Sequence, residues 1–258
     1  MIKQITNDTE LNLDLLENDC YSRKLKSNFY AYKTDYDFCR FYVAQYAEKT
    51  AIINIFNSSM LVAFIKGTTL IEDFTEDLVT FINMNKPSMI EMDRRMAVLI
   101  RDKISDEYYY ENRTEFEKTV PFDKGTIEPD EDIRLDDVFH IVREAFPALA
   151  DSYELWITDT SHRLRRNQSQ LFSYKNSATL MVKYVVDGYA LIGQVGTLPD
   201  ERGKGYARKL LFHVCDSIIR EGNKVCLFAR EKMVSYYKML GFVPVLEDIV
   251  FERKKDND

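Results

Sequence analysis

A stretch at residues 198–211, LPDERGKGYARKLL, has the residue types of an anion-binding loop. Gly203 and Gly205 allow bare backbone to approach a ligand closely or to take a positive φ. A helix that begins directly after such a loop offers unpaired backbone N–H groups and the positive end of its dipole, and both attract an anion. Lys204 and Arg208 add positive charge. The stretch therefore predicts a phosphate-binding loop, and the alternative is a plain tight turn.

Two well-known phosphate motifs do not fit this loop. The P-loop pattern G-x-x-x-x-G-K-[ST] is absent, and the dinucleotide pattern G-x-G-x-x-G/A fails at its last position, which is Arg208. A third pattern, [QR]-x-x-G-x-[GA], is satisfied by Arg202, Gly205 and Ala207. The loop also lies between a predicted strand at 189–198 and a predicted amphipathic helix, which is the setting that a phosphate cradle requires.

The elements on either side of the loop must position it, and they alternate in an α/β pattern. Apolar residues at a 3.6-residue period predict helices at 135–146, 152–166, 206–221 and 231–240. Alternating or continuous apolar runs predict strands at 170–176, 178–186, 189–198, 224–229 and 242–253.

The first half of the chain repeats this order with less definition. Helical spacing predicts helices near 9–17, 35–46, 74–84 and 93–103. Apolar runs predict strands at 51–57, 60–66, 88–92 and 106–120. The two halves therefore look like degenerate copies of one α/β unit. Gly67 is the only glycine before Gly125, so only the second copy has the glycine-rich loop.

Residues 121–132, PFDKGTIEPDED, are rich in proline, glycine and acidic side chains and read as a linker. They predict one domain at 1–122 and a second at 123–258. The expected fold class is α/β (α+β), with two tandem units that each have a mixed, mostly antiparallel sheet flanked by helices.

The composition limits the classes of partner. With 258 residues, 45% hydrophobic and 30% charged, the chain has the composition of a globular protein, and its net charge of −7 argues against nucleic-acid binding. It has no apolar run long enough for a membrane helix and no apolar core of a signal peptide near its first residue. Four cysteines without C-x-x-C spacing favour free thiols in a reducing cytoplasm. With three scattered histidines, we expect no metal site.

Two stretches, TLPDERGKGYA at 197–207 and YYKMLGF at 236–242, resemble the GNAT N-acetyltransferase superfamily. Members of that family have a strand, then R-G-x-G-x-G/A at the start of a helix, and later L-Y-x-x-x-G-F. The resemblance runs from Ile127 onward and is most specific over 189–242. The first half resembles a GNAT copy that lacks the cofactor loop. The chain would then consist of two tandem GNAT-like units.

The resemblance implies acetyl-CoA as the acyl donor, with its pyrophosphate on the glycine-rich loop. The backbone of Val195 and Thr197 would pair with the pantetheine arm, and the Val195 N–H would polarise the thioester carbonyl as an oxyanion donor. The implied cofactor-binding residues are Val195, Thr197, Arg202, Gly203, Lys204, Gly205, Tyr206, Ala207 and Arg208.

Tyr237 stands at the position of the tyrosine that protonates the departing CoA thiolate in this family. A phenol is neutral at pH 7 and can donate that proton. The alternative is that Tyr237 packs in the core with Met233 and Leu240, which lie at helical spacing from it. Tyr236 is the fallback for the acid.

The general base is not identified by the resemblance. Many relatives have a glutamate where this chain has Leu191, and often an asparagine where it has Arg230. A chain of waters, or a side chain of the helix at 152–166, would have to accept the proton of the amine. That helix carries polar side chains at helical spacing that face either a cleft or solvent: Asp159, His162, Arg163 and Arg166.

The sequence thus predicts a GNAT-type N-acetyltransferase in which a primary amine attacks acetyl-CoA directly, with Tyr237 and Val195 as catalytic groups. The acceptor would be a small-molecule amine, a lysine or an N-terminal amine. Transfer of a longer acyl chain is an alternative reaction, and a non-catalytic acyl-CoA-binding regulatory protein is the alternative of another class. A monomer or a homodimer in the cytoplasm is expected, with no nucleic acid or membrane as partner.

Overall fold

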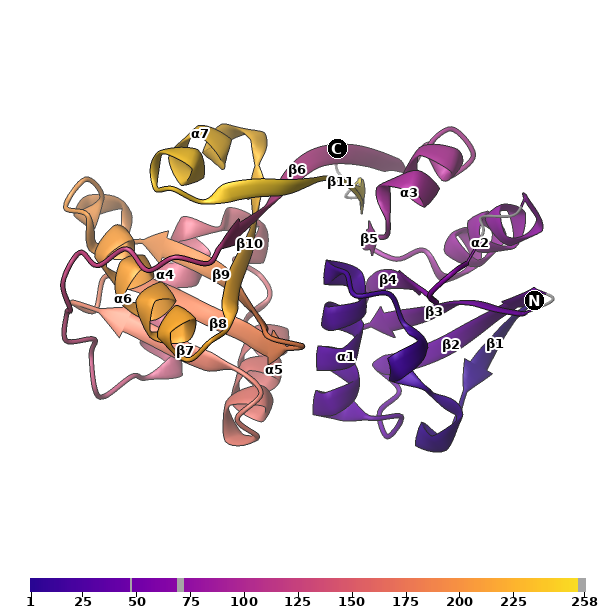
Figure 1. The fold of residues 1–258 in the computed structure, drawn as a ribbon, viewed down its shortest axis with the longest axis horizontal. Helices are drawn as coiled ribbons and strands as arrows, with labels where there is room; N and C mark the ends of the chain where they lie inside the picture. Colours follow the sequence, from indigo (N-terminus) through magenta and orange to yellow (C-terminus); the bar gives the residue numbers. More distant parts are fainter. Residues whose placement is uncertain (47, 69–71, 255–258) are drawn as a thin grey trace. The chain divides into compact units, whose positions relative to one another are not determined.

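The computed structural model describes residues 1–46, 48–68 and 72–254 (Figure 1). The chain forms two compact units. Unit 1 consists of Met1–Glu115, Ala229–Val234 and Leu246–Asp258, and unit 2 consists of Phe116–Phe228 and Ser235–Val245. The chain therefore returns to unit 1 twice after its first passage into unit 2. The domain boundary between residues 122 and 123, which was expected from the linker sequence, stays a prediction.

Unit 1 contains a mostly antiparallel sheet with helices. Its strands are β1 (Ile2–Ile5), β2 (Cys39–Tyr46), β3 (Glu48–Phe56), β4 (Ser59–Phe64), β5 (Met89–Glu91), most of β6 (Tyr108–Lys118) and the second part of β11 (Val243–Arg253). Its helices are α1 (Cys20–Tyr32), α2 (Glu72–Asn85) and α3 (Arg94–Ile100). Strands β1 to β4 pair antiparallel in order, β4 pairs parallel with β5, and β5 pairs antiparallel with β11.

Two helices expected near the start of the chain are wrong. Residues 9–17 form two short 3-10 turns, because Asn7 and Asn12 each accept a backbone N–H through the side chain and so favour a local turn. Residues 39–46 form β2, because antiparallel pairing with β3 buries its apolar side chains. The helix of this region is α1, which begins after Asp19, whose carboxylate accepts the Ser22 N–H at 2.7 Å.

Unit 2 follows the expected order closely. Its helices are α4 (Leu135–Ala145), α5 (Tyr153–Arg165), α6 (Tyr206–Arg220) and the second part of α7 (Glu231–Met239). Its strands are β7 (Gln170–Tyr174), β8 (Ala178–Val186), β9 (Tyr189–Thr197) and most of β10 (Lys224–Arg230). Figure 1 shows α6 in front of these strands and α4 behind them. The fold class expected from the sequence, tandem α/β units with mostly antiparallel sheets, is confirmed.

Both units share one local topology. In unit 2, β7, β8 and β9 pair antiparallel, and β9 then pairs parallel with β10. The parallel pairing joins residues 189–191 to residues 224–226 and ends there. In unit 1, β4 pairs with β5 in the same short parallel way, from Ser59 to Leu61. The two halves are thus built on the same strand arrangement, although only the second has the glycine-rich loop.

A buried ionic cluster occupies the end of the β4–β5 pairing in unit 1. The Glu91 carboxylate contacts Lys24 and accepts from Arg113 at 2.6 Å. Arg113 also donates to Asp248 at 2.5 Å, and Asp248 accepts the Tyr21 hydroxyl at 2.5 Å. Burial by itself would raise the pKa of Glu91, but the attraction of Lys24 and Arg113 outweighs it and lowers the pKa to about 2. Glu91 is therefore held as a buried carboxylate by two cations.

Candidate functional site

A pocket of about 270 Å³ opens beside the glycine-rich loop of unit 2. Most of the residues expected to hold a cofactor line it: Thr197, Arg202, Gly203, Gly205, Tyr206, Ala207 and Arg208. Glu201 and Tyr236 complete the lining. Val195, Lys204 and Tyr237, which were also expected at the site, are not among the lining residues. The pocket therefore brings together the end of β9, the loop and the first turn of α6.

The first turn of α6 presents unpaired backbone donors to this pocket. Gly205 is the N-cap, with φ +76° and ψ +17°, and no described side chain caps the helix. The first α-helical bond runs from the Lys209 N–H to the Gly205 carbonyl at 3.0 Å, so the amides of residues 206–208 precede that ladder. The first turn contains no acidic residue that would offset the helix dipole. This geometry suits an anion.

Positive backbone φ angles explain why glycine occupies both loop positions. Gly203 has φ +82° and Gly205 φ +76°, values at which an L-residue is strained. A Cβ at Gly203 would have no described atom within 4 Å, and one at Gly205 would meet the Arg208 guanidinium at 3.5 Å. The protein itself therefore leaves room beside the loop. A ligand that approaches the loop closely, as the two glycines predict, would therefore find open space there.

The cations of the loop are in different situations. Lys204 donates to Glu201 at 2.8 Å, and this hydrogen bond raises the pKa of Lys204. Arg202 and Arg208 are exposed and line the pocket. Burial raises the pKa of Tyr236, and the nearby Arg208 opposes that rise. The guanidinium groups of Arg202 and Arg208 can therefore contact an anion in the pocket.

Strand β9 leads into the loop and contains a β-bulge. Thr179 pairs with Gly196 and Met181 with Gly193, so β9 has one residue more than β8 between these pairs. Gln194 lies in that interval with φ +52°, which is uncommon for a residue with a side chain. Because the parallel pairing with β10 stops at Leu191, the rest of β9 has a main-chain edge that an extended ligand could pair with.

The two tyrosines of α7 are placed differently. Tyr237 is buried, with ring centroids 6.0 Å from Phe116 and 5.6 Å from Phe242. Burial raises the pKa of Tyr237 to about 12, so its phenol keeps its proton at neutral pH. Tyr236, 5.4 Å from Tyr237, is the one that lines the pocket. Tyr236, the alternative acid, therefore lies at the loop, whereas Tyr237, the expected acid, packs among aromatic side chains.

The polar residues of α5 that were considered for a general base, and the two residues at the positions of the usual glutamate and asparagine, contact other parts of the protein. Arg163 is buried on α5 and donates to Asp159 at 2.6 Å. His162 lies 3.2 Å from Arg166. Leu191 is buried at the end of the β9–β10 pairing. Arg230, in unit 1, forms ion pairs with two glutamates, Glu111 and Glu252. The candidates on α5 therefore contact one another, Asp159 with Arg163 and His162 with Arg166, and the general base stays unassigned.

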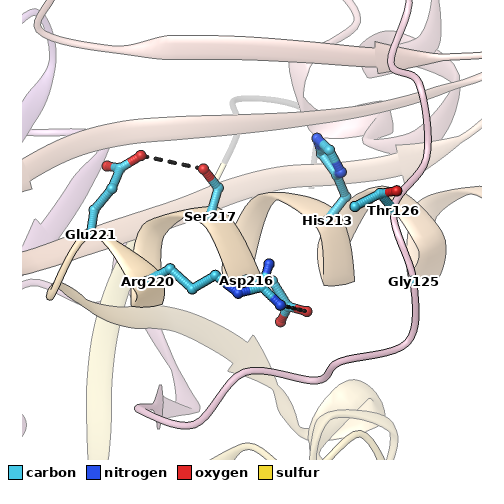
Figure 2. A pocket seen from close by; sticks show the side chains of 7 residues that line it. All are labelled: Gly125, Thr126, His213, Asp216, Ser217, Arg220 and Glu221. Atoms are coloured by element: carbon cyan, nitrogen blue, oxygen red, sulfur yellow. Dashed lines mark hydrogen bonds and ion pairs between the residues drawn. The ribbon is translucent and has the colours of Figure 1, made fainter.

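A second pocket of about 370 Å³ lies along the C-terminal half of α6, beside Gly125 and Thr126 of the linker (Figure 2). In Figure 2, Arg220 points toward Asp216, and Ser217 bonds with Glu221. The buried Asp216 carboxylate accepts the backbone N–H of Phe122 at 2.6 Å and of Asp123 at 2.9 Å. The carboxylate therefore ties the linker to α6, and this accounts for its burial without a ligand.

Residues 135–242 match the family model described as the acetyltransferase (GNAT) family. The match contains α4 to α6, the bulged β9, the loop and both tyrosines of α7. This part of the chain is therefore similar to the GNAT family. The family model does not extend over the first half of the chain. No curated protein matches the sequence.

Solved GNAT structures share the fold over nearly the whole chain. A GCN5-related N-acetyltransferase from Sphaerobacter thermophilus is 14% identical, with a TM-score of 0.65 over 98% of this chain and 95% of its own. A GNAT acetyltransferase from Colwellia psychrerythraea is 16% identical, with a TM-score of 0.58 over 98% and 100%. A tandem GNAT protein from the clavulanic acid biosynthesis pathway is 10% identical, with a TM-score of 0.63 over 100% and 99%. These neighbours support a fold of two GNAT-like units.

Other features bear on cofactor and location. Within residues 1–46, 48–68 and 72–254, no cluster of three or more histidine, cysteine or acidic side chains could hold a metal ion. No helix in that part of the chain has the length and apolar character to cross a membrane. All four cysteines are buried free thiols.

Sequence reasoning missed the Gln194 bulge, for which the glycines at 193 and 196 were the only available signal.

Proposed function

We propose that this protein is an N-acetyltransferase that moves the acetyl group of acetyl-CoA to a primary amine. The observation that carries the proposal is the pocket at the uncapped start of α6, bordered by glycines with positive φ and by Arg202 and Arg208. Backbone donors at a helix start suit a pyrophosphate, and guanidinium groups add charge-assisted hydrogen bonds. The GNAT family and fold support acyl transfer in general.

In this proposal acetyl-CoA lies along the loop and the adjoining end of β9. The pyrophosphate would lie on residues 202–208, and the pantetheine arm would pair with the free edge of β9 at Val195 and Thr197. The Lys204 ammonium, held by Glu201, would add charge at the rim. The Val195 N–H would donate to the thioester oxygen as negative charge develops on it.

In the proposed reaction, acetyl-CoA supplies an acetyl group activated as a thioester. The neutral amine nitrogen attacks the carbonyl carbon, the C–N bond forms, and the C–S bond breaks. Tyr237 gives its phenolic proton to the departing sulfur, and the nitrogen of the new amide loses one proton to water. The Tyr237 phenolate then regains a proton from water, so the enzyme returns to its starting state. The raised pKa of Tyr237 suits a group that must be protonated before it acts. Direct attack needs no protein nucleophile, and all four cysteines are buried.

A comparison of Tyr237→Phe with Tyr236→Phe tests the acid. If Tyr237 protonates the thiolate, Tyr237→Phe lowers kcat by about 10²-fold or more with acetyl-CoA affinity unchanged, and Tyr236→Phe affects mainly affinity. CoA release in the presence of polyamines, aminoglycosides and lysine peptides is the assay. An unchanged rate in Tyr237→Phe removes this residue from the mechanism. Longer acyl-CoAs in the same assay define the length of the acyl chain.

A non-catalytic acyl-CoA-binding regulatory protein is the second candidate. Buried Leu191 and the ion-paired Arg230, which replace polar residues common in relatives, favour it. Acetyl-CoA binding with no CoA release for any amine tested would select this candidate. A cytoplasmic location and a monomeric or homodimeric state complete the proposal.

A further inference from the structure

The β9 bulge is held in place by a side chain from α5. The Trp156 Nε1–H donates to the Gln194 Oε1 at 3.2 Å. Trp156 is itself buried, with its ring centroid 5.2 Å from that of Phe139 on α4. Packing therefore holds the Trp156 indole in place, and its N–H donates to Gln194, the β9 residue that has a positive φ. A strained backbone of this kind persists only where its surroundings determine it.

The same region of β9 is also held from α4. A Cβ at Gly196 would lie 2.7 Å from the Cβ of Ala145 and 3.2 Å from the ring of Phe146. The end of α4 therefore closes directly on β9, two residues after Gln194. Contacts from both helices converge on the bulge, and all of these residues lie in unit 2.

The peptide bond after Gln194 carries the N–H of Val195. The direction of this N–H depends on the backbone angles of Gln194. The restraints beside it are the hydrogen bond from Trp156 to the Gln194 side chain and the packing of Ala145 and Phe146 against Gly196. We propose that Trp156 and Gln194 are a positioning pair that aims the Val195 N–H at the thioester oxygen. This inference rests on the proposed function, since it assigns α5 a part in activating the acyl donor. A donor that is aimed in advance loses no energy to reorganisation when charge develops.

Matched variants separate this role from simple packing. Gln194→Met keeps the length of the side chain and the cost of the positive φ but removes the oxygen that Trp156 contacts. Gln194→Glu keeps an acceptor oxygen at the same reach. Trp156→Phe keeps a ring against Phe139 and removes the N–H. Because none of these residues lines the loop pocket, each folded variant should still bind acetyl-CoA through residues 202–208.

The measurement is the infrared carbonyl stretch of bound [1-¹³C]acetyl-CoA, with affinity measured by calorimetry on the same samples. We expect the wild type to shift the stretch to lower frequency than in free acetyl-CoA, and Gln194→Met and Trp156→Phe to lose most of that shift. Gln194→Glu should keep it. If Trp156→Phe does not fold, the Met and Glu variants still decide the question.

The possible failures are distinguishable. A wild-type protein that does not bind acetyl-CoA refutes the proposed function, and this inference with it. Binding with a shifted carbonyl that Gln194→Met and Trp156→Phe leave intact overturns the positioning pair and leaves the proposed function standing. Binding without any carbonyl shift in the wild type overturns the role of the Val195 N–H.

Discussion

Glu91 provides a quantitative test of the energetics of unit 1. Its side chain is 4% exposed, and its two oxygens contact Lys24 and Arg113. The substitution Glu91→Gln keeps the shape and removes the charge, so that the cations lose their buried counter-ion. The lowering of the Glu91 pKa from 4.5 to about 2 corresponds to about 3 kcal/mol of stability at neutral pH. Breaking a buried ion pair typically costs about 3–5 kcal/mol, in agreement.

Thermal unfolding at pH 7 measures this effect. For a unit of this size, about 3 kcal/mol lowers Tm by roughly 10 °C. Glu107→Gln is the matched control, because Glu107 pairs with Lys86 at 3.6 Å with both side chains more than half exposed. We expect it to cost less than about 1 kcal/mol, as exposed pairs do.

The dependence on pH gives an independent check of the sign. The pKa of Glu91 is lower in the folded protein than in the unfolded chain, so its contribution is present above pH 4.5 and is lost as the pH falls toward 2. The difference in Tm between the wild type and Glu91→Gln should therefore shrink over this range. A difference that is the same at pH 7 and pH 2.5, or a cost below about 1 kcal/mol at pH 7, would refute the reasoning.

Three further predictions concern unit 2. Asp216→Asn turns an amide NH₂ toward the backbone N–H of Phe122 or Asp123, and it should lower the free energy of unfolding in urea by about 1–3 kcal/mol. An unchanged urea midpoint would contradict the anchoring role. Gly196→Ala places a Cβ 2.7 Å from that of Ala145 and should cost about 1–3 kcal/mol by thermal unfolding, whereas wild-type stability would mean that α4 can move away. Because the pKa of Tyr237 is raised to about 12 and an acid acts below its pKa, kcat should show no loss near pH 10 if Tyr237 is the acid.

The second half of the chain was predictable because local and tertiary preferences agree there. Helix α6 has a strong apolar stripe, begins at a glycine and ends before Gly222, and strands β7 to β9 are separated by short turns. The position of the glycine-rich loop at the start of α6 follows from these signals. The pocket is lined by the loop residues that the family resemblance named, except Lys204.

The first half was less predictable because tertiary pairing overrides local spacing. Residues 39–46 have apolar side chains at intervals that fit a helix, but pairing with β1 on one side and β3 on the other makes them a strand. Helix α1 was missed because it buries polar residues such as Ser22 and Asn28, which hides its amphipathic pattern. The ionic cluster around Glu91 joins elements far apart in sequence, and no local pattern predicts it.

The bulge at Gln194 marks another limit of sequence reasoning. Glutamine is not a residue type associated with positive φ, so its conformation depends on contacts from Trp156 and on the register of β8. The burial of Tyr237 between Phe116 and Phe242 likewise depends on packing. The sequence placed both residues on the correct elements and left their environments open.

Calorimetric titration of acetyl-CoA tests the central claim most directly. Wild type would be compared with Gly205→Glu, which puts a carboxylate at the proposed phosphate site, and with Gly222→Glu at the other end of α6. Gly222 also has a positive φ, +89°, with no described atom within 4 Å of an added Cβ, so this control carries the same charge and backbone strain. Micromolar binding in wild type and Gly222→Glu that is lost in Gly205→Glu is the predicted result. No binding to wild type, or equal binding to Gly205→Glu, would contradict an acyl-CoA site at residues 202–208.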